Sequence, residues 1–68
     1  MTQQLSHKDV MYLTDHLEIE QQQIQKFNTA ANEVGDAQCK RMFQDIANMH
    51  QRHFDTLKKH LSGQNMMS

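Results

Sequence analysis

Apolar side chains recur at alternating steps of four and three residues on both sides of one internal glycine, Gly35. This spacing keeps one stripe of a helix apolar and is typical of helical bundles and coiled coils. The stripe before Gly35 contains Leu13, Leu17, Ile24, Phe27 and Ala31, and the stripe after it contains Cys39, Phe43, Ile46, Leu57 and Leu61. The chain has no proline, which also favours helices over a turn-rich β fold. The sequence therefore predicts an all-α fold with two long helices.

Residues with strong helix-end preferences mark the first helix and the turn. Ser6 is a good N-cap, and Asp9 follows three residues later, which is the spacing of a capping box. Gly35 suits the left-handed position that ends many helices. Asp36 follows at once and can cap the next helix. We therefore expect the first helix at about 6–34 and a very short turn.

The second helix is expected at about 37–62, with Gly63 as its stop. A flexible segment over 1–5 and a disordered tail over 63–68 would flank the hairpin. Helices joined by so short a turn must be nearly antiparallel. A domain-swapped arrangement, with one long helix per chain, stays open, although Gly35 argues against it.

The length of 68 residues makes a lone core marginal, because scaffolds of this size usually need disulfides, a metal ion or a partner chain. Cys39 is the only cysteine, so an intrachain disulfide is excluded. We expect Cys39 to be a small buried residue near the turn, and a single cysteine also indicates a reducing, cytoplasmic location. The sequence therefore predicts a homodimer in which two hairpins form a four-helix bundle.

Three polar residues interrupt the apolar stripes: Glu20 in the first helix, and His50 and His53 in the second. We call them the polar trio. Glu20 lies fifteen residues before Gly35 and His50 fifteen residues after it. At about 1.5 Å per residue, both lie roughly 22 Å from the turn, and His53 is one helical turn further along. We therefore expect the trio at one level of the bundle, where a twofold axis would bring together two glutamates and four histidines.

Two interpretations of the polar trio stay open. Histidines at positions i and i+3 can share an ion with a facing glutamate, and this donor set suits zinc, copper, nickel or iron(II) better than magnesium or calcium. Alternatively, the trio is a metal-free hydrogen-bonded network that sets helix register and partner choice. A buried glutamate needs a partner in either case.

Two further residues are candidates for positions next to the trio: His16 as a hydrogen-bond partner or an outer ligand, and Tyr12 as a hydrogen-bond partner. His16 lies one turn before Glu20, and Tyr12 lies one turn before His16. The competing interpretation places His16 on a flank of the bundle and uses Tyr12 for packing with a hydrated hydroxyl.

Charge and hydropathy exclude two classes of partner. The formal net charge is −1, and no basic patch with interleaved aromatic residues is present, so we do not expect nucleic-acid binding. No apolar run approaches the length of a membrane span, and no signal peptide is visible, so we expect no membrane partner.

The arrangement of the trio resembles half of a ferritin-like bundle, as in rubrerythrins and the spore coat protein F family. That pattern has a Glu in the first helix and a Glu-x-x-His in the second. Glu20 matches the first Glu and His53 matches the His, whereas His50 stands where the second Glu would be. The segments 27–30 and 44–48 look closest to the spore coat group. The resemblance covers nearly the whole hairpin, from about Leu5 to Leu61.

The resemblance implies a ferritin-like four-helix bundle built from two chains. It also implies a structural role in assembly with other coat or assembly proteins, in the cytoplasm or the spore coat, with a candidate zinc or iron site at the trio. The alternative is a ferritin-like metal protein with redox or storage activity. Ferritin-like sites often use four carboxylates and two histidines to hold two ions. With His50 in place of a Glu, a dimer offers only two carboxylates, which weighs against an enzyme.

Overall fold

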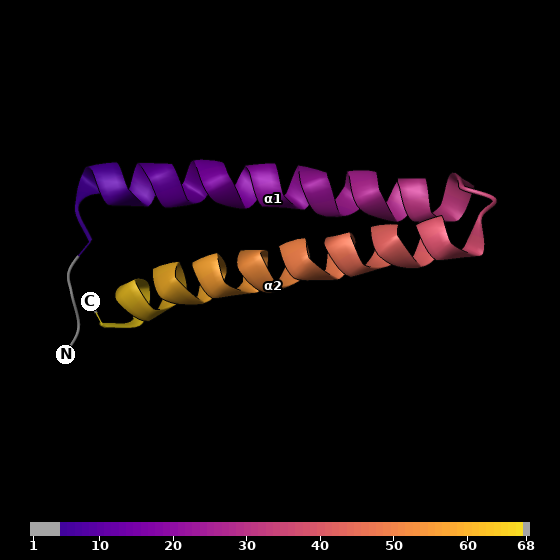
Figure 1. The fold of residues 1–68 in the computed structure, drawn as a ribbon. Helices are drawn as coiled ribbons and strands as arrows, with labels where there is room; N and C mark the ends of the chain where they lie inside the picture. The colour runs from indigo at the N-terminus through magenta and orange to yellow at the C-terminus, as the bar shows by residue number, and fades with distance from the viewer. Residues whose placement is uncertain (1–4, 68) are drawn as a thin grey trace.

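The computed structural model describes residues 5–67, and over this range the chain forms two helices and no strand. Helix α1 spans His7–Glu33 and helix α2 spans Ala37–Met67. They lie side by side in opposite directions, and α2 returns to the end at which α1 begins (Figure 1). The predicted all-α hairpin is confirmed, and the break at 34–36 excludes one continuous helix. Neither helix, within the described range, is both long and apolar enough to cross a membrane.

Side-chain caps begin both helices as predicted. The Ser6 side chain accepts a hydrogen bond from the Asp9 backbone N–H at 3.0 Å, and the Asp9 carboxylate accepts one from the Ser6 N–H at 3.2 Å. This reciprocal capping box satisfies N–H groups that have no partner within the helix. At α2, Asp36 Oδ1 accepts a hydrogen bond from the Cys39 backbone N–H at 2.7 Å. That bond is the main reason why the pKa of Asp36 is lowered from its ordinary value.

The prediction of a left-handed Gly35 is wrong, because no glycine in the described range has a positive φ. The chain instead leaves α1 at Val34, which is extended at φ −75° and ψ 143°, and the Val34 N–H still donates to the Ala30 carbonyl at 3.0 Å. The direction of the chain therefore reverses through an extended residue followed at once by the Asp36 cap.

The second helix also ends later than predicted. It passes through Gly63 and continues to Met67, so residues 64–67 are helical and not the disordered tail expected from the sequence. A glycine costs a helix only about 1 kcal/mol relative to alanine, which weakens the helix without ending it. The predictions for residues 1–4 and Ser68 lie outside the described residues.

The contact between the helices follows the predicted stripes but is narrow. Ala31 and Ala47 are the only buried side chains among those the structure describes, each 2% exposed. The other apolar stripe residues are half-buried: Leu13, Leu17, Ile24, Phe27, Phe43, Ile46, Leu57 and Leu61. Cys39 departs from the prediction because it is exposed. In a lone hairpin only the side chains directed at the other helix lose contact with water, and Cys39 lies outside that contact.

Candidate metal centre

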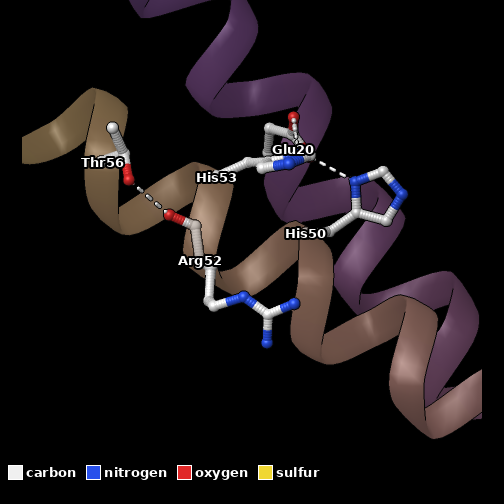
Figure 2. A network of polar contacts seen from close by, with 5 residues as sticks. All are labelled: Glu20, His50, Arg52, His53 and Thr56. Carbon is white, nitrogen blue, oxygen red and sulfur yellow. Dashed lines mark hydrogen bonds and ion pairs between the residues drawn. The ribbon is translucent and has the colours of Figure 1, made fainter.

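The polar trio lies in the middle of the hairpin. Glu20 is the central residue of α1, with equal lengths of helix before and after it, and His50 and His53 lie at the centre of α2. Figure 2 shows both histidines reaching from α2 toward the glutamate on α1. Arg52, which lies between them in the sequence, points away from the trio. The prediction that the three side chains meet at one level is confirmed.

Each oxygen of the Glu20 carboxylate faces an imidazole nitrogen. His50 Nδ1 is 2.5 Å from Glu20 Oε1, a short hydrogen bond in which the nitrogen donates because an ionised carboxylate only accepts. His53 Nδ1 is 3.4 Å from Glu20 Oε2. The Glu20 and His50 side chains are 13% and 20% exposed, whereas His53 is 54% exposed. The trio is therefore covered on one side and open on the side of His53.

Aromatic packing holds the His50 ring in place. The Phe27 ring stacks on it, with the ring centroids 5.7 Å apart and the planes 11° apart. Phe27 is itself stacked on Phe43 at 5.9 Å. The His53 ring meets His50 edge-on at 5.9 Å. Glu20 and the stacked Phe27, both on α1, therefore orient the His50 ring before any ion binds, which lowers the entropy cost of binding.

The trio is close enough to hold a metal ion, because three ligand atoms, one from each residue, lie within 4.8 Å of one another. Zinc with bonds of 2.0–2.1 Å in tetrahedral geometry separates its ligand atoms by roughly 3.3 Å. The 3.4 Å contact between His53 and Glu20 matches this separation. The 2.5 Å contact to His50 is a hydrogen-bond distance, so an ion would replace that hydrogen and part the two groups by about 1 Å. Two imidazoles and one carboxylate suit zinc or iron(II) better than magnesium or calcium.

The structure does not bring the two outer candidates into this group. His16 is exposed, and Tyr12 is 61% exposed. Phe27 is the supporting residue that the sequence analysis did not assign to the site. Its position, seven residues after Glu20 on the same helical stripe, is the signal that could have identified it.

Comparisons with protein-family models, curated proteins and solved structures give no match to this chain. The resemblance to ferritin-like bundles and spore coat proteins therefore stays a prediction from the residue pattern.

Proposed function

We propose that this protein is a small helical-bundle protein that binds one divalent transition metal ion, zinc or iron(II), through Glu20, His50 and His53. The observation that carries the proposal is the meeting of three ligand atoms from two helices at the middle of the hairpin. Because the ligands come from both helices, a bound ion would hold α1 against α2. Its binding free energy would add to the stability of a fold with very little buried core.

The role that fits this site is structural. One chain supplies a single carboxylate to the trio, whereas sites that hold two ions for oxygen chemistry rely on several bridging carboxylates. A single ion that staples two helices needs no bridging carboxylate. The resemblance to coat proteins extends the proposal to a role in a larger assembly.

The second candidate is a metal-free network, and the 2.5 Å hydrogen bond between His50 and Glu20 favours it. That bond, the 3.4 Å contact to His53 and the stacked Phe27 would fix the register of the two helices without an ion. The two candidates differ in one observable, which is whether the purified protein takes up metal in a fixed ratio.

Metal uptake by the untagged protein, measured by elemental analysis and by titration with zinc and iron(II), tests the proposal. We expect one ion per chain and a higher melting temperature with metal. His53→Ala should weaken binding by about a hundredfold, since outer partners alone account for 10- to 100-fold and a direct ligand should cost at least as much. His60→Ala is the matched control, because His60 is an exposed histidine seven residues further along α2.

Retention of stoichiometric metal in His53→Ala would show that the trio is not the site. A wild-type protein that takes up neither metal and gains no thermal stability would overturn the metal-binding function and favour the network.

A further inference from the structure

The hairpin has two broad faces, and residues next to the trio show which face is which. Gln21 and Gln51, which directly follow Glu20 and His50, line one shallow groove together with Gln25, Asn28 and Asn32. We call this amide-rich side the polar face. Each step along a helix turns by about 100°, so the residues that directly precede Glu20 and His50 point to the opposite side. Those two residues are Ile19 and Met49.

The opposite side is apolar and exposed. Ile19 is 47% exposed and Met49 37%, and seven residues before them on the same stripes lie Tyr12 at 61% and Met42 at 57%. We call these four residues the apolar face. His53 follows Met49 by one helical turn and opens onto the same face, which explains its 54% exposure. The open side of the trio therefore lies next to exposed apolar residues.

The hairpin is too thin to cover this face itself. Its Cα atoms extend over 48 × 20 × 12 Å, a single layer of helices, whereas stable domains pack two layers around a core. Only Ala31 and Ala47 are buried among the described side chains. A side of the hairpin with Cα extents of 48 by 20 Å has room for the roughly 800 Å² that each partner contributes to a stable protein interface. A second layer of about the same length is what the fold lacks.

We propose that a second copy of this chain packs on the apolar face and encloses the metal site. The enclosed metal site rests on the proposed function. The docking surface rests instead on the exposure of the apolar face and on the dimensions of the hairpin. A copy has the required length and carries the same apolar stripe, as the self-complementary interface of a twofold dimer requires. Its net charge of −1 opposes association only weakly.

The central position of the trio favours a copy over an unrelated partner. Glu20 is the midpoint of α1, so a twofold axis through the middle of the apolar face brings both trios to the same level, whichever way the copies run. One trio offers three ligand atoms, and a tetrahedral ion has a fourth position. Because His53, the exposed member of the trio, lies on the side of the apolar face, a copy docked there would shield a bound ion from water.

The test compares two double variants that add the same charge at equivalent distances from the trio. Ile19→Glu with Met49→Glu alters the apolar face, and Gln21→Glu with Gln51→Glu alters the polar face. Light scattering gives the mass, circular dichroism the helix content, and zinc titration the affinity. We expect wild type and the polar-face variant to have twice the chain mass of 8.0 kDa with zinc bound. The apolar-face variant should be monomeric or unfolded. Its zinc affinity should fall by about tenfold or more, because dimerisation and zinc binding are linked.

The mass of the wild-type protein tests the proposal even if the apolar-face variant does not fold. A wild-type protein that binds zinc as a monomer at every concentration would overturn the inference and leave the proposed function standing. A monomeric polar-face variant together with a dimeric apolar-face variant would also overturn the inference. A dimer that requires the apolar face but takes up neither zinc nor iron(II) would overturn the proposed function and support the docking of the copy.

Discussion

The two broad faces of the hairpin differ in how the groove between the helices is covered. On the polar face one side chain crosses it, because Lys40 Nζ donates to the Ala31 carbonyl of the other helix at 2.7 Å. Within α2, the Lys58 ammonium lies 6.0 Å from the centre of the Phe54 ring, which lines the amide-rich groove. On the apolar face, Tyr12, Ile19 and the two methionines remain exposed. The polar face therefore has a contact between the helices within one chain, whereas the proposed second copy would supply the cover of the apolar face.

The largest effect on stability should come from truncating a residue of the apolar face, compared with the same truncation on the polar face. Met49→Ala should lower the free energy of unfolding by about 2 kcal/mol or more, because a methionine covered by a second copy is a core residue. Gln51→Ala, two residues away on the polar face, should change it by less than about 0.5 kcal/mol. Urea unfolding at equal chain concentration measures both. Equal small effects would break the comparison, since Met49 would then be as solvated as Gln51.

Removing the lysine that crosses the polar face should have a moderate effect. Lys40→Met keeps the apolar stem but loses the hydrogen bond to the Ala31 carbonyl, so stability should fall by about 1 kcal/mol. Arg41→Met is the control, because Arg41 is exposed. Chemical denaturation at several protein concentrations should show the same loss at each, since the bond lies within one chain. A loss confined to low concentration would place Lys40 in an interface instead.

The turn offers a smaller, stabilising change that lies outside both faces. Gly35 has no positive φ, and an added Cβ would meet no atom within 4 Å. Gly35→Ala should therefore raise the free energy of unfolding by about 0.4–1 kcal/mol, because alanine restricts the unfolded chain. Thermal unfolding monitored by circular dichroism measures the change. A loss of stability would show that Gly35 needs a left-handed conformation after all.

The smallest effect concerns the Asp36 cap and its pH dependence. The folded protein lowers the pKa of Asp36 below the ordinary 3.8, chiefly through the hydrogen bond from the Cys39 N–H. The stabilisation is therefore fully present above about pH 4 and is lost as the pH falls through the lowered pKa. Asp36→Ala should be less stable than wild type at neutral pH, and the difference should shrink in acid. A difference that stays constant down to pH 2 would contradict this account.

Much of the hairpin and of the candidate site could be predicted from spacing alone. The steps of four and three placed the stripes, and the equal distances of Glu20 and His50 from Gly35 placed the trio at one level. Both follow from the regular rise and turn of a helix. The stacking of Phe27 on His50 depends on ring orientation, which spacing does not determine.

The errors share a physical origin. The burial of Cys39 was predicted for a full bundle, and a single hairpin leaves that position in water. Gly63 was assigned as a helix stop, and Gly35 a left-handed conformation, from statistical preferences, although glycine can adopt other conformations. The actual ends depend on Val34 and on the continuation of α2, which no local motif specifies.

X-ray absorption spectroscopy of the zinc-loaded protein tests the central claim most directly, because it reports which atoms surround the ion. We expect a first shell of nitrogen and oxygen at about 2.0–2.1 Å with the outer-shell signature of two imidazoles, and the signature of at most one imidazole in His50→Ala. A sulfur shell near about 2.3 Å would assign the zinc to Cys39, and an imidazole-free shell would assign it to surface carboxylates. Either result would contradict a metal site at Glu20, His50 and His53.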